Sequence, residues 1–282
     1  MRSAITICLV PEARQGPFVF HTSGDAAGLA AACSAAADLG FDAVEIFPAS
    51  AAAFPRAELA RLLAEHGLVV AAVGTGAGWV KHKLHLCHGD AAVRAEAREF
   101  IAELIDVAGE FGAPAIIGSM QGSSEGDVSR DDGVGLLAAA LHELGARAAV
   151  HGQVLLYEPL NRYETNLFNR QGDAASWLTS QGLADVKLLC DLFHMNIEET
   201  DVAAALAAAG SRVGHVHWAD SNRRAMGLGH VNARPIVAAL RAIGYEGFLS
   251  AEVLPLPTAL DAARQTIESL RGHAGAVWPS AE

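Results

Sequence analysis

The chain has 282 residues, which allows one large domain or two small ones and excludes a small protein that needs disulfides or metals to fold. Its composition, 51% hydrophobic and 18% charged, is typical of a packed globular core and excludes a disordered chain. The formal net charge of −12 makes nucleic acid and anionic membrane surfaces poor partners.

The N-terminal apolar run, residues 5–10, stops at Pro11 and lacks the basic region and cleavage-type tail of a signal peptide. No transmembrane helix is apparent, so we expect a cytoplasmic protein. The four cysteines lie far apart without a C-x-x-C pair, which favours reduced thiols. Cys8 and Cys190 stand inside apolar runs, where we expect them to be core residues.

One pattern recurs along the chain: an alanine-rich amphipathic stretch, then a glycine, then a short apolar run. Glycine tolerates the left-handed conformation that ends helices, so each joint predicts a helix followed by a buried strand. With an opening strand at Ala4–Val10, seven joints make eight strands. The glycines at these joints are Gly40, Gly67, Gly112, Gly152, Gly182, Gly210 and Gly244.

Successive joints lie 27 to 45 residues apart, a spacing that suits single βα units. The apolar runs are continuous, as in parallel strands covered on both faces. Eight such units in this length, with no G-x-G-x-x-G after a strand, predict an α/β fold with a closed (β/α)8 TIM barrel rather than an open sheet. No linker or change of composition divides the chain, so we expect a single domain over residues 1–282.

Catalytic residues of such barrels gather where the strands end, at the C-terminal face. Polar residues are expected at six strand ends, and the last four of them are metal-ligand types on consecutive strands. Three carboxylates and one imidazole suit Mn²⁺, Mg²⁺ or Co²⁺ better than structural zinc. A polar cap is the ordinary explanation for one such residue, but four together favour a single divalent ion. The six residues are Glu45, Ser119, Glu158, Asp191, His217 and Glu252.

Four segments of the second half resemble the motifs of the xylose-isomerase-like TIM-barrel sugar isomerases and epimerases. The resemblance is closest to the D-tagatose/L-ribulose/D-psicose 3-epimerase branch, while the first half matches mainly in architecture. The segments are Y-E-P-L-N-R-Y-E-T-N (157–166), C-D-L-F-H-M-N-I-E-E (190–199), G-H-V-H-W-A-D-S-N-R-R (214–224) and S-A-E-V (250–253).

The resemblance implies a ketose 3-epimerase that uses one divalent metal ion, most often Mn²⁺, with Mg²⁺, Co²⁺ or Zn²⁺ as substitutes. It implies that Glu158, Asp191, His217 and Glu252 bind the metal, and that Glu158 and Glu252 also move protons. It further implies that three residues hold the sugar near its O1 and O2. These residues are His194, Arg223 and Glu164.

The chemistry of epimerisation is consistent with this set of residues. Removing the proton beside a ketone creates an enediolate, whose charge a metal ion stabilises as a Lewis acid. Epimerisation also needs a base on one face of the substrate and an acid on the other. Glu158 and Glu252 belong to the fifth and eighth strands, so we expect them to approach from different sides.

Other functions stay open at this point. A sugar dehydratase or lyase and an aldose–ketose isomerase use the same scaffold and ligand set. Arg223 and Arg224 precede a glycine-rich turn, which leaves a phosphorylated sugar possible, although the branch resemblance favours a free ketose. An abasic-site endonuclease would need more metal ligands and a basic face, and a non-catalytic barrel would lose a proton-transfer carboxylate. We expect a small-molecule sugar as the partner, and a homo-oligomer.

Three histidines at three-residue steps, His82, His85 and His88, could form a second metal site. No carboxylate or cysteine completes a ligand set, so we expect a solvated loop helix that walls the pocket. Trp79 and Lys81 are candidate lid residues of the same segment.

Two further polar residues are expected inside the barrel. His215 lies on the strand face of His217, one pleat deeper, and should be a buried core residue or a partner of a metal ligand. Glu45 fits either such a partner or a packing polar group.

Overall fold

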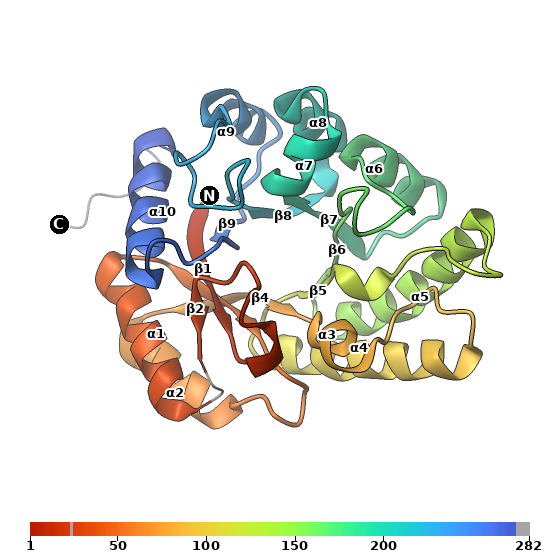
Figure 1. Ribbon diagram of the computed structural model, residues 1–282, viewed down its shortest axis with the longest axis horizontal. Coiled ribbons are helices and arrows are strands. Elements are labelled where there is room, and N and C mark those ends of the chain that lie inside the picture. The colour runs from red at the N-terminus through yellow and green to blue at the C-terminus, as the bar shows by residue number, and fades with distance from the viewer. Residues whose placement is uncertain (23–24, 275–282) are drawn as a thin grey trace.

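A closed barrel of parallel strands forms the centre of the computed structural model, which describes residues 1–22 and 25–274 (Figure 1). The first strand pairs with both the second and the last strand of the barrel, which closes it. The predicted (β/α)8 barrel is therefore confirmed. Its strands are β1 (Arg2–Cys8), β3 (Ala43–Phe47), β4 (Val69–Gly74), β5 (Ala115–Ile117), β6 (Leu155–Tyr157), β7 (Val186–Asp191), β8 (Val213–His217) and β9 (Phe248–Ala251).

The opening strand, β1, differs from its predicted range of Ala4–Val10. The chain leaves the barrel before Pro11, which begins a short 3-10 helix, η1 (Pro11–Ala13). The returning segment adds a very short strand, β2 (Phe20–His21), that pairs in parallel with the end of β1. Two residues carry too little periodicity for a sequence pattern to reveal such a strand.

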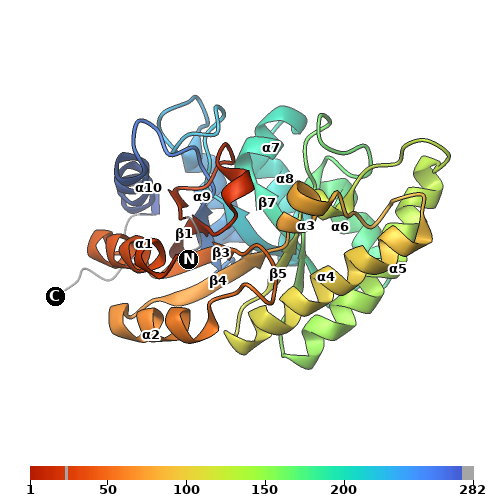
Figure 2. The same ribbon diagram turned by 60° about the horizontal axis from the view of Figure 1, so that its bottom comes forward.

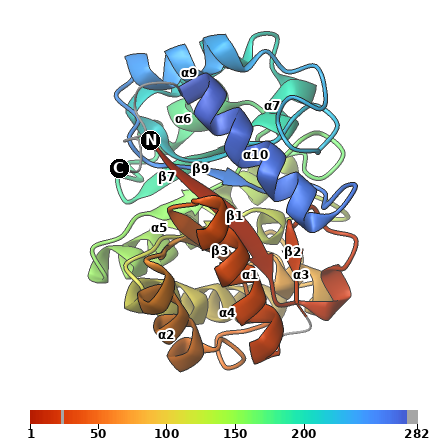
Figure 3. The same ribbon diagram turned by 90° about the vertical axis from the view of Figure 1, so that its left-hand side faces the viewer.

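Helices form a ring around the barrel, and two short helices lie in loops at one end of it (Figure 2). The last helix contacts both β1 and the first helix, which completes the ring (Figure 3). The outer helices are α1 (Ala26–Leu39), α2 (Arg56–His66), α4 (Ala91–Glu110), α5 (Arg130–Val150), α6 (Gln171–Ser180), α8 (Val202–Ala209), α9 (Ala233–Ala242) and α10 (Ala259–Ala274). The two loop helices are α3 (Ala77–His82) and α7 (Leu192–Glu198), and the remaining 3-10 helices are η2 (Ser119–Gln121) and η3 (Gly210–Arg212).

The seven glycine joints have the positive φ that the sequence predicts, although Gly210, with a ψ of −130°, lies outside the left-handed helical conformation. Each has a positive φ, between 55° at Gly210 and 83° at Gly40, and each lies between a helix and the following strand. Most L-amino acids avoid this left-handed region, so glycine here marks where the chain turns back into the barrel.

Side chains alternate along each strand between the interior of the barrel and the helices. On β6, Leu156 packs with other interior residues, whereas Tyr157 belongs to the layer beneath the helices. Glu158, the next residue, therefore faces the interior at the mouth of the barrel. The four cysteines are buried and unpaired, which confirms Cys8 and Cys190 as core residues.

Helix α5 is long and apolar enough to cross a membrane, judged by length and composition alone. In this structure Leu137, Leu141 and Leu144 of α5 are buried. The helix packs on α4 and β6, so its apolar face belongs to the layer between helices and barrel.

Substitution by alanine should have opposite effects on stability at two exposed glycines, one at a joint and one inside a helix. Gly112→Ala, at φ 64°, should lower the free energy of unfolding by about 1 kcal/mol because alanine is strained there. Gly135→Ala, within α5 and with open space around its Cβ, should raise it by about 0.5–1 kcal/mol. Urea unfolding of both variants checks this, and a neutral or stabilising Gly112→Ala would contradict it.

Candidate active site

A cavity of about 560 Å³ opens at the C-terminal ends of the strands. Its wall has two chemically different halves. Residues at or beyond the ends of β6 to β9 supply the charged half: Glu158, Glu164, His194, His217, Arg223 and Glu252. Residues at or beyond the ends of β1, β3 and β4 supply a largely apolar half: Cys8, Val10, Phe18, Phe47, Ala77, Trp79 and Val80.

The four side chains expected to bind a metal converge in the charged half. The Nδ1 atom of His217 lies 3.2 Å from Asp191 Oδ2, 3.3 Å from Glu252 Oε2 and 3.9 Å from Glu158 Oε1. All four side chains are buried. Glu158 Oε1 has no hydrogen-bond partner among the described residues, so a buried acceptor faces the centre of the cluster.

Asp191 has two separate tasks at the end of β7. Its Oδ1 accepts the backbone N–H of Phe193 at 2.8 Å and so caps the start of α7. Its Oδ2 points toward His217 and the cavity centre. The cap therefore fixes the orientation of a carboxylate that faces the other charged groups.

Glu45 lies in the middle of β3 rather than at a strand end, and it is fully buried. His217 donates from Nε2 to Glu45 Oε1 at 2.9 Å, and His215 Nε2 lies 2.7 Å from Glu45 Oε2. Burial raises the pKa of Glu45, but the charges of His217 and His215 outweigh it and hold that pKa well below its usual range. Glu45 is thus a partner of both histidines, and it leaves His217 Nδ1 free to face the site.

The cluster concentrates negative charge away from water. Burial raises the pKa of Glu158 well above its usual value, and the carboxylates of Glu252 and Asp191 raise it further. Burial alone would lower the pKa of His217, but the neighbouring Glu45 and Glu252 raise it well above its usual value. Both shifts indicate a site that favours added positive charge.

Arg223 provides one positive charge at this point. Its guanidinium donates to Asp191 Oδ2 at 2.5 Å and to Glu252 Oε2, and it lies 4.8 Å from the centre of the Phe193 ring. Burial raises the pKa of Asp191, but Arg223 and His194 outweigh it and hold that pKa well below its usual range. Arg223 lines the cavity, whereas Arg224 is absent from the described lining residues.

Asp220, which the sequence analysis did not single out, anchors the loop that carries Arg223. Its buried carboxylate accepts four backbone N–H groups at 2.7 to 3.0 Å. The donors lie before, within and after the glycine-rich turn of the loop. They are Ser221, Gly227, Gly229 and Val231.

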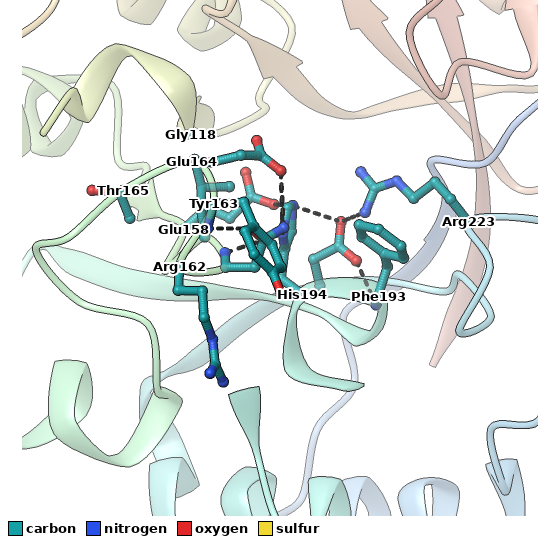
Figure 4. Close-up of polar contacts among 12 residues, drawn as sticks. Gly118, Glu158, Arg162, Tyr163, Glu164, Thr165, Phe193, His194 and Arg223 are labelled. Atoms are coloured by element: carbon teal, nitrogen blue, oxygen red, sulfur yellow. Dashed lines mark hydrogen bonds and ion pairs between the residues drawn. The ribbon is translucent and has the colours of Figure 1, made fainter. Parts of the chain in front are cut away.

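His194 and Glu164 stand next to each other beside the cluster (Figure 4). His194 Nε2 lies 3.8 Å from Glu158 Oε1 and 3.9 Å from Asp191 Oδ2, while its Nδ1 lies 3.7 Å from Glu164 Oε1. His194 is buried, and Glu164 is about half exposed. The structure therefore brings both residues, together with Arg223, to the wall of one cavity.

Gln121 binds the backbone of Glu158, a contact that the sequence did not indicate. Its Nε2 donates to the backbone oxygens of Glu158 at 2.8 Å and Gly118 at 3.0 Å, and the Tyr157 hydroxyl donates to its Oε1 at 2.8 Å. A Cβ atom at Gly118 would lie 2.5 Å from Glu158 Oε2. The turn after β5 therefore packs directly against both the backbone and the side chain of Glu158. Ser119, one of the six polar residues expected at strand ends, lines the cavity.

The expectation of a solvated segment around His85 is wrong in part. His82 ends α3 and is exposed, but His85 is buried, because its apolar neighbours pack inward and Leu86 donates its N–H to Met120 O at 2.8 Å. No group of potential metal ligands among the described residues includes these histidines. Of the two candidate lid residues, Trp79 lines the cavity and contacts His85 edge-on, whereas Lys81 and the three histidines are absent from the described lining residues.

Residues 33–273 match the family model described as xylose isomerase-like TIM barrel. The chain belongs to this family. It is 30% identical over 239 residues to the L-ribulose 3-epimerase of Mesorhizobium japonicum, which covers 83% of this chain and 78% of that protein. It is also 30% identical over 224 residues to the D-psicose 3-epimerase of Agrobacterium fabrum, and this match covers 75% of this chain and 74% of that protein.

The solved structures of the family include a close match in fold. The D-allulose 3-epimerase of a Methylomonas species, solved in complex with D-allulose, superposes with a TM-score of 0.83 at 26% sequence identity. The match covers 97% of each chain.

Replacing the carboxylate of Asp220 should weaken the loop that carries Arg223. Burial raises the pKa of Asp220, but the four backbone N–H groups outweigh it and lower that pKa. Asp220→Asn should lower the free energy of unfolding at pH 7 by about 1–3 kcal/mol, because an amide NH₂ then faces N–H donors.

The loss of unfolding free energy caused by Asp220→Asn should depend on pH. Because the folded-state pKa is lowered, the stabilisation is complete above the unfolded-state pKa of about 3.9 and is lost as pH falls through the folded-state value. Urea unfolding of wild type and Asp220→Asn between pH 7 and pH 3 should show the difference shrinking only at the acid end. A difference that stays constant over this range would contradict the assignment.

Proposed function

We propose that this protein is a divalent-metal-dependent ketose 3-epimerase that acts by proton transfer through an enediolate. The observation that carries the proposal is the convergence of Glu158, Asp191, Glu252 and the Nδ1 atom of His217 at the mouth of one cavity. The family relationship supports it, because relatives over most of the chain are named ketose 3-epimerases.

The residues at this point fit a divalent cation. Two overlapping groups, Glu158–Asp191–His194 and Asp191–His217–Glu252, each bring their ligand atoms within 4.8 Å of one another. Glu158 Oε1 is buried without a partner among the described residues, and burial together with the carboxylates of Glu252 and Asp191 raises the pKa of Glu158. Three carboxylates with one imidazole favour Mn²⁺, Mg²⁺ or Co²⁺. Glu158, Asp191, His217 and Glu252 would hold the ion, which would act as a Lewis acid toward the sugar's oxygens.

The positions of Glu158 and Glu252 support a role for both in proton transfer. They follow β6 and β9, the strands on either side of the β7–β8 pair that carries Asp191 and His217. A ketose between them would therefore meet one carboxylate on each side. One carboxylate removes the C3 proton to give the enediolate, and the other returns a proton to the opposite face.

Three further residues would hold the sugar. Arg223 and His194 present N–H donors at the cavity wall, and Glu164 presents an acceptor. Donors suit a carbonyl oxygen or the oxygen of an enediolate, and the acceptor suits a hydroxyl. This set matches the hydroxyketone end of a ketose.

The charges of the cavity favour an unphosphorylated substrate. Among the described residues that line it, Arg223 is the only Arg or Lys, whereas Glu12, Glu158, Glu164 and Glu252 supply four carboxylates. A phosphate group would meet net repulsion here. The D-allulose bound to the Methylomonas relative is an unphosphorylated ketose of the kind that we propose.

The function is tested with a panel of free ketoses and the Mn²⁺-loaded protein in D₂O. We expect a product of unchanged skeleton that carries deuterium at C3, and a chelator should abolish turnover until Mn²⁺ or Co²⁺ is restored. Glu158→Gln and Glu252→Gln should each lower kcat by about 10²- to 10⁴-fold, because glutamine keeps the size but removes the base. Metal affinity is measured alongside, since both residues are proposed ligands.

Other outcomes of this experiment would point elsewhere. A product lighter by one water would favour the dehydratase. Exchange at C1 with formation of an aldose would favour the isomerase. Full turnover by the metal-free protein would exclude the proposed metal role.

Glu45 should control metal affinity through His217. Glu45→Gln weakens the acceptor that orients the imidazole, so we expect Mn²⁺ affinity to fall by about 10- to 100-fold. Isothermal titration of the metal-free variant measures this, with Glu12→Gln, a half-exposed carboxylate of the cavity wall, as the control. Equal affinities for Glu45→Gln and wild type would contradict the role.

A further inference from the structure

Asn161 contacts two of the residues proposed to hold the sugar, yet it does not itself line the cavity among the described residues. It lies in the loop after β6 and is only 3% exposed. Its contacts reach His194 on α7 and Glu164 in its own loop. A buried amide in this place acts through its neighbours rather than on a ligand.

The orientation of the Asn161 amide follows from its hydrogen bonds. Its Oδ1 accepts the backbone N–H of Tyr163 at 2.9 Å, and a backbone N–H can only donate. The other amide atom is therefore the NH₂ group. That group lies 2.7 Å from His194 Nδ1 and 2.9 Å from Glu164 Oε1, so its two hydrogens have one acceptor each.

The same contacts fix the proton of His194. The backbone N–H of Asn161 also donates to His194 Nδ1, at 3.2 Å. Two donors directed at Nδ1 require that this atom carry a lone pair, so the ring proton of the neutral imidazole resides on Nε2. Nε2 is the atom that faces Glu158 and Asp191, at 3.8 Å and 3.9 Å.

We propose that Asn161 is a positioning residue that holds His194 in its Nε2–H tautomer and tethers Glu164, so that His194 presents an N–H donor and Glu164 a carboxylate acceptor to the substrate. The proposal rests on the proposed function, since the matching ligand is a hydroxyketone: its carbonyl oxygen accepts from His194 and its hydroxyl donates to Glu164. In the opposite tautomer, His194 would present a lone pair to the carbonyl oxygen and repel it.

The tautomer is measured directly in the metal-free protein without substrate. Two-bond ¹H–¹⁵N correlation spectra of ¹⁵N-histidine-labelled protein distinguish a protonated ring nitrogen from an unprotonated one. The spectrum of His194→Gln identifies the His194 signals among those of the 12 histidines. We expect wild-type His194 to have an unprotonated Nδ1 and a protonated Nε2.

Two variants remove the NH₂ group of Asn161 and so release Glu164, but only Asn161→Asp also places an acceptor oxygen against His194 Nδ1. Asn161→Asp places an acceptor oxygen against Nδ1, so Nδ1 should become protonated and kcat should fall by about 10- to 100-fold, as for other residues that orient an active-site histidine. Asn161→Ala keeps the backbone donor to Nδ1 but releases Glu164. It should mainly raise KM, and it carries the test alone if Asn161→Asp does not fold.

Asn169→Ala is the matched control. Asn169 donates to the backbone oxygens of Leu160 at 2.8 Å and Thr165 at 2.9 Å, so it braces the same loop without touching His194 or Glu164. The control should keep the wild-type His194 spectrum and KM even if its melting temperature falls.

Three results would overturn the proposal: a protonated Nδ1 in wild type, unchanged spectra and kinetics in both Asn161 variants, or the same KM rise in Asn169→Ala as in Asn161→Ala. The last would show that loop bracing alone explains the effect. A wild type that turns over no ketose would instead contradict the proposed function, while the spectrum would still decide the tautomer.

Discussion

Three buried carboxylates at the mouth of the barrel repel one another, and the rest of the site is arranged around that repulsion. Removing a carboxylate from water is costly unless positive charge or donors compensate it. Here Arg223 bridges Asp191 and Glu252, and a backbone N–H holds the other oxygen of Asp191. Glu158 is compensated less, since its Oε1 has no hydrogen-bond partner among the described residues and burial raises its pKa despite the nearby charges of His217 and Arg223. A bound divalent cation would complete the balance of charge.

Much of the surrounding structure serves to aim these groups. Glu45 fixes which nitrogen of His217 faces the cavity, and Gln121 ties the backbone of Glu158 to the turn after β5. Asp220 binds both ends of the loop that carries Arg223. Each works through contacts made before any ligand arrives, which reduces the reorganisation that a reaction would require.

The sequence was sufficient to predict the barrel because its signals are local. Glycine joints and apolar runs repeat along the chain, and the strand ends that they define place Glu158, Asp191, His217 and Glu252 at one face. The exact start of β1, the strand β2 and the burial of His85 depend on packing between distant segments, which no local pattern records. His85, for example, is buried because the chain next to it pairs with the loop after β5.

The residues that orient the site were harder to find for the same reason. Asn161 stands in a polar loop without periodicity, and its role appears only when α7 brings His194 against it. Gln121 likewise acts through a backbone oxygen of another segment, and Asp220 acts through backbone N–H groups up to 11 residues further along its own loop. Glu45 lies within a strand rather than at its end, and its partners lie 170 and 172 residues away in the sequence.

The central claim is that one divalent cation occupies the point between the four side chains. A crystal grown with Mn²⁺ and measured at a wavelength where manganese scatters anomalously tests it most directly. We predict a single strong anomalous peak per chain in contact with Glu158, Asp191, His217 and Glu252. No peak at this point at saturating Mn²⁺, or a peak held by other residues, would contradict the account.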